Sequence, residues 1–392
     1  MTSEWHEVPL RELVGYISKG IAPSYAEEAS ETTIRVLNQK CNRNFRISYG
    51  DSRLHDTLKK KVPPERYVKP DDILINSTGA GTAGRIAQIE DVPSATTIDG
   101  HMILIRSNGK VTQKFLGYAL KAHQWEVLQL DEGSTGQTEL NRDRLLDEIM
   151  INYPVSFDEQ NAIVGTLESI DRKLIVNKEI NDNLQQQASA LFSSFYDWSN
   201  TEVRYTDLIQ ILGGGTPKTG ENTYWNGNIA FFTPKDVGTP YTLITEKTIT
   251  EEGLSHCNSR LYPVNTVFVT ARGTVGKVGM SGVPMAMNQS CYALVGKETH
   301  QLLVYFYTLK AVDRLKHKAS GAVFDAITTR DFESEQIMKL SDDDAKAFLC
   351  IAEPMFQKVL NNCIENLRLS TLRDSLLPKL MSGEVDVSAV QL

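Results

Sequence analysis

The chain of 392 residues repeats itself, and this internal duplication restricts its fold more than any other feature. The segment GTAGRI at 81–86 returns as GTVGKV at 273–278. Both copies follow an apolar run, ILI at 73–75 and VFV at 267–269, so each predicts a strand, a tight turn and a second strand. A duplicated sequence folds into similar units, and we therefore expect two β-rich domains of one architecture.

Further matches occur in the same order along both halves. YALKA at 118–122 corresponds to YTLKA at 307–311. Two more pairs match at one constant offset: Arg142-Asp143 with Arg330-Asp331, and Ile149-Met150 with Ile337-Met338. The repeat therefore extends through each half and is not confined to one motif.

Each half ends in a long segment whose pattern predicts a heptad helix, because apolar residues recur at alternating steps of four and three. The second helix repeats the first position by position, and only Arg373 breaks the apolar pattern. The seam positions are Ile163, Leu167, Ile170, Leu174, Asn177, Asn181, Leu184, Ala188, Leu191 and Phe195, then Phe348, Ala352, Met355, Val359, Asn362, Asn366, Leu369, Arg373, Leu376 and Leu380.

Two asparagines interrupt each seam at the same place. A buried asparagine costs stability but fixes register, because a slipped pairing would leave its amide unsatisfied. We predict antiparallel helices in which Asn177 faces Asn366 and Asn181 faces Asn362, with a pseudo-two-fold axis near the four amides. In the alternative, these asparagines face solvent and the helices pack elsewhere.

Gly79, Gly81 and Gly84 form a G-x-G-x-x-G pattern, and Asp99 lies where a dinucleotide-binding fold would place its ribose-binding acid. That fold also needs a helix to begin at the third glycine. Residues 85–89 instead alternate like a strand, and the second copy of the motif lacks the first glycine. We therefore interpret the glycines as a strand–turn–strand and keep a dinucleotide enzyme only as a distant alternative.

The net charge of −8 does not exclude nucleic acid, because much of the acidic excess lies in the two predicted helical stretches. Residues 157–198 hold three basic against seven acidic residues, and residues 342–392 hold five against eight. The two large segments are nearly neutral, with 19 basic against 21 acidic residues over 1–156 and 14 against 13 over 199–341. A basic face on either segment is compatible with these numbers.

The cysteines suggest a reducing, cytoplasmic environment, because they are odd in number, scattered and without a C-x-x-C pair. They are Cys41, Cys257, Cys291, Cys350 and Cys363. We expect no transmembrane helix, since no apolar run approaches about eighteen residues. We also expect no signal peptide, since the start MTSEWHEVPL has neither a basic nor an apolar region.

The sequence predicts no catalytic or metal site. No (N/D)-P-P-(Y/F) motif of an adenine methyltransferase occurs, and GGGTPKTG at 213–220 lacks the Lys-Ser/Thr of a phosphate loop. Asp158 with 171–173 resembles a nuclease carboxylate–lysine set but lies along one heptad helix, as a solvated face would. The seven histidines show no metal-ligand spacing, and His101 is best explained as a histidine on a domain face.

The layout resembles the specificity (S) subunit of type I restriction–modification systems over essentially the whole chain. The order and duplication of the motifs carry the resemblance. The motifs are ISKGIAPSY at 17–25, VPPERYVKPDDILINSTGAGTAGRI at 62–86, GGGTPKT at 213–219, YWNGNIAFFTPKDV at 224–237, TARGTVGKVGM at 270–280, MNQSCYAL at 287–294 and LLPKLMSGEV at 376–385.

The resemblance implies an α+β protein with two β-rich target recognition domains, at 1–156 and 199–341. Two long antiparallel helices, at 157–198 and 342–382, form a coiled-coil spacer, and a tail covers 383–392. Each domain would read one half of a bipartite double-stranded DNA target. The helices would set the spacing and dock the methyltransferase (M) subunits, of which two are implied. Restriction (R) subunits would join for cleavage.

The resemblance also implies a catalytically silent chain without its own cofactor. S-adenosylmethionine, ATP and Mg²⁺ would belong to the partner subunits, which make the assembled complex an adenine DNA methyltransferase and ATP-dependent endonuclease. The main alternative is a two-headed scaffold that binds proteins or glycans across a fixed span, since a duplication with a spacer fits either function.

For DNA contact we predict three loop sets in each domain, chosen because polar loop residues suit phosphates and base edges. In the first domain they are Lys19 and Tyr25, then Asn38, Lys40 and Arg43, then Thr78 and Arg85. In the second they are Lys218 and Thr219, then Thr233, Lys235 and Asp236, then Arg272, Lys277, Asn288 and Gln289. Arg85 and Lys277 are favoured because both copies keep a basic residue after the turn.

Overall fold

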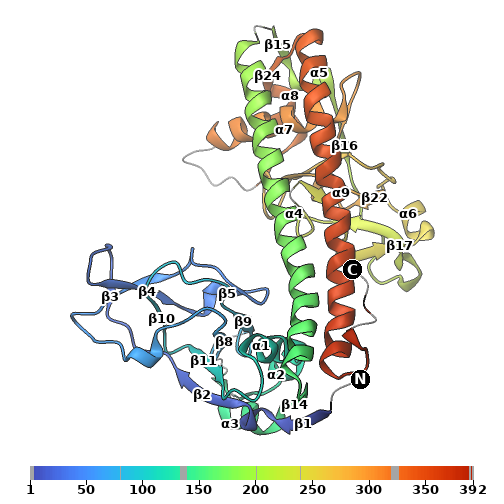
Figure 1. Ribbon diagram of the computed structural model, residues 1–392. Coiled ribbons are helices and arrows are strands. Elements are labelled where there is room, and N and C mark those ends of the chain that lie inside the picture. The colour runs from blue at the N-terminus through green and yellow to red at the C-terminus, as the bar shows by residue number, and fades with distance from the viewer. Residues whose placement is uncertain are drawn as a thin grey trace. The chain divides into compact units, whose positions relative to one another are not determined.

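The structure is a computed structural model that describes residues 4–79, 81–132, 139–199, 201–238, 240–318, 326–387 and 390 (Figure 1). The chain divides into two compact units. Unit 1 comprises residues 1–172 and 369–392, and unit 2 comprises residues 173–368. Each long helix therefore contributes one part to each unit.

Unit 1 contains an antiparallel sheet in the order β2-β11-β8-β9. Its strands are β2 (Val14–Lys19), β8 (Ile73–Asn76), β9 (Ile86–Gln88) and β11 (Met102–Ser107). All four side chains of β8 are buried, as expected when an apolar run forms a central strand. Helix α1 (Gln113–Ala122) buries Phe115 and Leu116 in the same core as Ile73 and Ile75 of β8.

A second sheet in unit 1 has the order β10-β4-β7-β3. It consists of β3 (Tyr25–Ala26), β4 (Thr33–Leu37), β7 (Arg53–Asp56) and β10 (Thr96–Ile98). Strands β10 and β4 are parallel, and β7 is antiparallel to β4. A third sheet pairs β1 (Trp5–Pro9) with β14 (Met150–Pro154). Because β14 is the last strand before the first long helix, this pairing places the first strand of unit 1 beside the last.

The remaining elements of unit 1 are short. They are η1 (Leu10–Glu12), η2 (Gln39–Cys41), η3 (Pro64–Arg66), α2 (Gln124–Val127), α3 (Arg142–Glu148), the pair β5 (Asn42–Arg43) and β6 (Arg46–Ile47), and the pair β12 (Asp131–Glu132) and β13 (Glu139–Leu140).

Unit 2 repeats this topology. Its larger sheet has the order β16-β23-β20-β21-β18, and the smaller has the order β19-β17-β22 with β17 parallel to β22. The strands are β16 (Ile209–Gly213), β17 (Trp225–Phe232), β18 (Tyr241–Thr242), β19 (Lys247–Ile249), β20 (Val267–Thr270), β21 (Val278–Ser281), β22 (Met285–Met287) and β23 (Cys291–Gly296). Antiparallel β15 (Thr201–Arg204) and β24 (Gln336–Lys339) match β1 and β14.

The helices of unit 2 also follow the repeat. Helix α7 (Gln301–Lys318) takes the place of α1, and α8 (Thr329–Ser334) takes that of α3, as the matched motifs predict. Short segments α5 (Tyr205–Leu208), α6 (Glu251–Ser255) and η4 (Asn222–Tyr224) complete the unit. The expected pair of similar α+β domains is confirmed.

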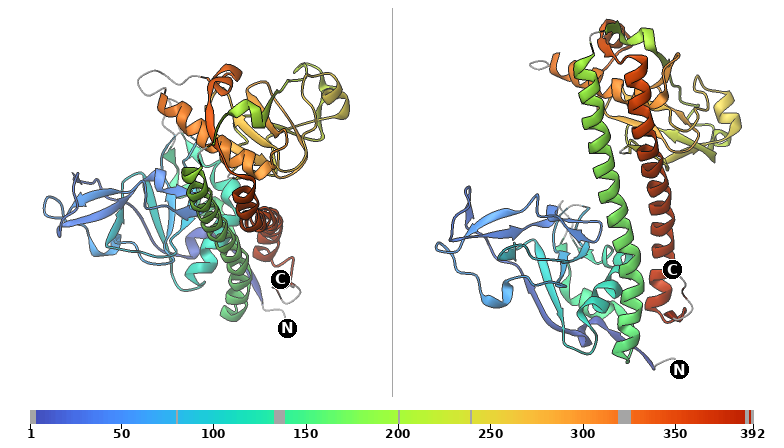
Figure 2. Two further views of the ribbon diagram at one scale, coloured as in Figure 1. Left: turned by 90° about the horizontal axis from the view of Figure 1, so that it is seen from above. Right: turned by 45° about the horizontal axis from the view of Figure 1, so that its top comes forward.

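The two expected long helices are α4 (Phe157–Trp198) and α9 (Asp342–Met381), and both are continuous (Figures 1 and 2). In unit 2 their apolar residues join the core around Phe192, which stacks on Phe306 at 5.0 Å and meets Phe348 edge-on at 5.4 Å. In unit 1, Ile163 and Leu167 of α4 share a core with Leu380 of α9.

The asparagine pairing confirms the predicted antiparallel register within unit 2. Asn177 Nδ2 donates to Asn366 Oδ1 at 2.9 Å, and Asn362 Nδ2 donates to Asn181 Oδ1 at 2.8 Å. Asn177 and Asn362 are each 1% exposed, so the alternative of solvent-facing asparagines is wrong. Because the residue number rises along one helix as it falls along the other, the two segments are antiparallel.

Arg373, the residue that breaks the apolar seam, has a partner in unit 1. Its Nη1 lies 3.0 Å from Asp171 Oδ1 on α4. Asp171 also accepts from Tyr118 Oη at 2.9 Å and lies 3.2 Å from Lys121 Nζ. Burial alone would raise the pKa of Asp171, but the adjacent Lys121 and Arg373, with the hydrogen bond from Tyr118, hold it below its ordinary value.

Candidate functional site

The strand ends of unit 1 meet at one end of its two sheets. Asp99 N–H donates to Leu37 O at 2.9 Å, which joins the ends of β10 and β4. Ile21 N–H donates to Ile98 O at 2.9 Å, which links the two sheets, and Ser77 N–H donates to His101 O at 2.8 Å, which joins the ends of β8 and β11. We call this end tip 1. It comprises residues 19–21, 38–43, 53, 77–79, 81–85 and 99–101.

Unit 2 builds the same end with the same bonds. Asn288 N–H donates to Phe232 O at 3.0 Å, Gly215 N–H to Met287 O at 3.1 Å, and Ala271 N–H to Ser290 O at 2.8 Å. We call this end tip 2. It comprises residues 213–219, 233–236, 247, 271–277 and 288–290.

In each tip, a glycine directly after a strand, β2 in unit 1 and β16 in unit 2, lets the loop approach the backbone of a second loop closely. A Cβ on Gly20 would lie 2.1 Å from Asp99 O, and a Cβ on Gly214 would lie 2.2 Å from Asn288 O. Real Cβ atoms do not approach so closely, so both positions require glycine. The motifs ISKGI and GGGTP therefore carry the same steric requirement, although the surrounding letters differ.

The repeated G-T-x-G-basic motif forms one turn in both tips. Gly84 N–H donates to Asn76 O at 2.8 Å and Gly276 N–H donates to Thr270 O at 2.9 Å. Both glycines have positive φ, 83° and 74°. Strand β9 begins at Ile86, two residues after Gly84, so the helix that a dinucleotide site needs is absent at this described position and that alternative is wrong.

Several predicted residues of tip 1 are held by neighbouring groups. Lys19 forms an ion pair with Glu139, and Thr78 Oγ1 lies 2.7 Å from His101 Nδ1. Asn38 caps η2 by accepting from Lys40 N–H at 2.9 Å, and it donates to Asp51 O at 2.7 Å. These contacts explain how the loops are positioned, while their role in ligand contact stays a prediction.

Three predicted cations of tip 1 have no carboxylate within ion-pair distance among the described residues. Lys40 and Arg43 are exposed, and Arg43 Nε donates only to Lys40 O at 3.2 Å. Arg85 is half-buried and donates from Nη2 to Gly81 O at 3.0 Å, which ties it to the glycine turn. Tip 1 therefore carries positive charge that the described part of unit 1 does not neutralise.

In tip 2, Asp236 organises a loop. Its carboxylate accepts from Thr233 N–H at 2.8 Å, from Thr233 Oγ1 at 2.6 Å and from Glu246 N–H at 2.7 Å. Lys235 is exposed and lies 3.5 Å from a carboxylate oxygen of Glu246. Thr233 and Asp236 are therefore hydrogen-bonded to each other, and Lys235 is the exposed member of this predicted set.

The other predicted residues of tip 2 reach its surface. Lys218, Thr219, Arg272, Lys277 and Gln289 are exposed, and Asn288 is half-buried. Within the part of unit 2 that the structure describes, Lys218, Arg272 and Lys277 have no ion-pair partner. Gln289 accepts a hydrogen bond from Thr216, which joins two of the predicted loops.

Sequence reasoning missed two exposed cations, Arg53 and Lys247. Each lies over an aromatic ring, Arg53 over Tyr25 and Lys247 over Trp225. They were missed because the strands that carry them, β7 and β19, share no motif. Only the strand register reveals that they correspond.

Burial disfavours the charged form of titratable groups at and beside the tips. Burial raises the pKa of the Cys291 thiol to about 12 and also raises the pKa of the Asp99 carboxyl above its ordinary value. Among the described residues, no group of three His, Cys, Asp or Glu side chains could hold a metal ion. The described chain also has no helix long and apolar enough to span a membrane.

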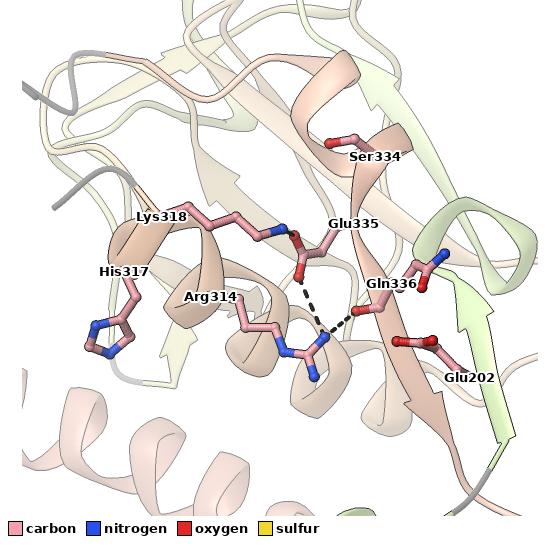
Figure 3. Close-up of a pocket in the computed structure, with 7 residues that line it drawn as sticks. All are labelled: Glu202, Arg314, His317, Lys318, Ser334, Glu335 and Gln336. Carbon is pink, nitrogen blue, oxygen red and sulfur yellow. Dashed lines mark hydrogen bonds and ion pairs between the residues drawn. The ribbon is translucent and has the colours of Figure 1, made fainter.

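A pocket in unit 2, between α7, α8, β15 and β24, does not extend the basic surface (Figure 3). Its Arg314 and Lys318 both point toward Glu335, whose side chain is 1% exposed and pairs with both cations. Arg314 Nη1 also donates to Gln336 O at 2.6 Å. Glu335 pairs with both cations and Glu202 also lines the pocket, so two carboxylates balance the two cations, and the pocket is a structural ion-pair site.

The family model "Type I restriction modification DNA specificity domain" matches residues 2–186 and 197–339. The MjaIX specificity subunit of Methanocaldococcus jannaschii is 31% identical over 33% of this chain and 31% of its own length. The HindI specificity subunit of Haemophilus influenzae is 28% identical over 46% of this chain and 40% of its own length. The matches thus span roughly a third of the length of these curated relatives.

A solved structure supports the fold. The type I restriction-modification S subunit from M. genitalium has a TM-score of 0.62 at 14% identity, covering 97% of this chain and 96% of that chain. At this identity the likeness concerns architecture alone. The family assignment comes from the sequence model, whose two matches span each half of the repeat and together exceed half of the chain. The chain belongs to the family of type I restriction modification DNA specificity domains.

Proposed function

We propose that this chain is the DNA-specificity subunit of a type I restriction–modification complex, in which each unit reads one half of a bipartite DNA target. The observation that carries the proposal is the duplicated tip. Both units bring loops after equivalent strands to one surface and leave cations there without carboxylate partners among the described residues.

The chemistry of the tips suits duplex DNA. Cations such as Arg43 and Lys277 match backbone phosphates, which supply the sequence-independent part of binding. Amides and hydroxyls such as those of Gln289 and Thr219 match base edges, which supply sequence discrimination. Because the two tips have the same backbone arrangement but different side chains, each half-site would have its own base sequence.

The paired helices would set the separation of the half-sites and provide docking surfaces for two methyltransferase subunits, with restriction subunits joining for cleavage. Support comes from the buried asparagine pairs in unit 2, which fix the helix register. The chain itself would be catalytically silent. S-adenosylmethionine, ATP and Mg²⁺ would be bound by the partner subunits, and the complex would act on DNA in the cytoplasm.

The test is the salt dependence of binding. The full chain, assembled with its methyltransferase subunits, is titrated with random-sequence duplex DNA at several salt concentrations. A steep linear fall of log K against log salt supports phosphate neutralisation. A flat response, or no binding, contradicts the proposal and favours the alternative of a two-headed scaffold for proteins or glycans.

A further inference from the structure

Unit 1 holds an exposed guanidinium on an exposed ring. Arg53 is the first residue of β7, and its Cζ lies 4.7 Å from the centroid of the Tyr25 ring on the neighbouring edge strand β3. Tyr25 remains 46% exposed. A cation above an aromatic face is attracted by the ring quadrupole, which restricts the side chain without neutralising its charge.

Unit 2 holds a matching cation. Lys247 is the first residue of β19, and its Nζ lies 5.6 Å from the centroid of the Trp225 ring. Trp225 is itself anchored, because Nε1 donates to Lys218 O at 3.1 Å and its ring packs edge-on against Phe231 at 5.5 Å. The ring therefore connects Lys247 to the loop of Lys218.

Strand register shows that Arg53 and Lys247 occupy equivalent positions. In unit 1, Val36 of β4 pairs with Arg53 on one side and with Thr97 of β10 on the other. In unit 2, Phe231 of β17 pairs with Lys247 on one side and with Ala286 of β22 on the other. Each cation thus lies opposite the same central-strand position, one residue before that strand ends.

Among the residues that the structure describes, neither cation has a carboxylate within ion-pair distance. The buried carboxyl of Asp99 interacts with the charge of Arg53 at longer range, and burial raises the pKa of that carboxyl. Both cations lie at the end of the sheet that forms the tip. Asn38 of tip 1 contacts Asp51, two residues before Arg53, and Asp236 of tip 2 contacts Glu246, the residue before Lys247. The two units use different cations and different rings to hold one positive charge at one place. The two units therefore share a positive charge at this position, although the residue types differ.

We propose that Arg53 and Lys247 each bind a backbone phosphate of DNA, with Tyr25 and Trp225 as positioning residues; this inference rests on the proposed function. Phosphate is favoured over a base because Arg and Lys replace each other here. A phosphate accepts either the planar fork of arginine or the point charge of lysine, and it is present at every position of the duplex whatever the base. Two units that read different half-sites can therefore both keep this contact.

The test uses the full chain with its methyltransferase subunits and random-sequence duplex DNA as the probe. Arg53→Gln and Lys247→Gln should each lower the slope of log K against log salt by about 0.9 and weaken binding about fivefold near 0.15 M salt, the value of one phosphate contact. The double variant should show both losses added. Tyr25→Ala should weaken binding, and Tyr25→Phe should restore it because the ring face is kept.

Matched controls exist at the opposite end of the sheets. Lys110 follows β11 and Lys297 follows the equivalent strand β23, and both are exposed. Lys110→Gln and Lys297→Gln should leave the slope unchanged. If Arg53→Gln and Lys247→Gln also leave it unchanged while the parent complex retains a steep slope, this inference fails and the proposed function stands. If the parent complex has no steep slope, the proposed function itself fails.

Discussion

The buried amide pair Asn181–Asn362 should show strong energetic coupling. Asn362 is 1% exposed, its Oδ1 has no hydrogen-bond partner among the described residues, and its Nδ2 donates to Asn181 Oδ1 at 2.8 Å. Asn181→Leu removes the acceptor and leaves a buried amide unpaired, which should cost about 1–3 kcal/mol of unfolding free energy. Asn362→Leu should cost a similar amount because it strands the Asn181 carbonyl.

The double variant should behave differently, since it removes both polar groups and fills the seam with leucine. Replacing a buried polar pair by apolar groups is often neutral or stabilising, so its unfolding free energy should lie within about 1 kcal/mol of the parent or above it. The coupling energy should then reach about 2 kcal/mol. Urea denaturation of the four proteins measures it, provided that unfolding is cooperative.

Additive and near-zero effects of the two single changes would refute the reasoning, because solvated amides would behave in that way. The double variant should also lose register specificity, as seams do when a polar pair is removed. Its complex should then tolerate more than one separation between the half-sites in methylated DNA.

Three further predictions follow from single sites. Lys277→Glu should weaken DNA binding about tenfold or more by placing a negative charge at tip 2, while thermal unfolding stays unchanged; equal affinity would remove Lys277 from the interface. Gly84→Ala should lower the unfolding free energy by about 1–3 kcal/mol, because φ is 83° and the new Cβ would lie 2.9 Å from Val127 O, whereas a stable variant would contradict the turn geometry. Asp171→Asn should cost about 3–5 kcal/mol at pH 7, because Lys121 and Arg373 lose a partly buried partner. The folded-state pKa of Asp171 is lowered, so its contribution to the unfolding free energy is present above its unfolded pKa and is lost as pH falls through the folded pKa. In urea titrations, the unfolding free energies of the parent and of Asp171→Asn should therefore converge below about pH 4. A constant difference between them down to about pH 3 would contradict this.

The duplicated architecture could be predicted from sequence because periodicity and repeated motifs report it directly. The seam of alternating threes and fours predicted α4 and α9, and the asparagines in step predicted which amides face each other. These features depend on local pattern and on one symmetry argument, both of which are visible in the letters.

Other features depend on contacts between distant residues and could not be predicted. Arg373 looked like a defect in the seam, but it pairs with Asp171, about 200 positions earlier in the chain. Arg53 and Lys247 lie in segments without sequence similarity, and only the register with β4 and β17 shows that they correspond. Their rings come from different strands, so no spacing rule relates Tyr25 to Trp225.

The most direct test of the account is to map methylated positions in host DNA with and without the gene for this chain. The account predicts a motif of two short half-sites at a fixed separation that is present with the gene and lost without it. Charge-reversing changes in tip 1 or tip 2 should weaken methylation of that same motif. A methylation pattern that does not change when the gene is removed would contradict the claim that this chain selects the DNA sequence.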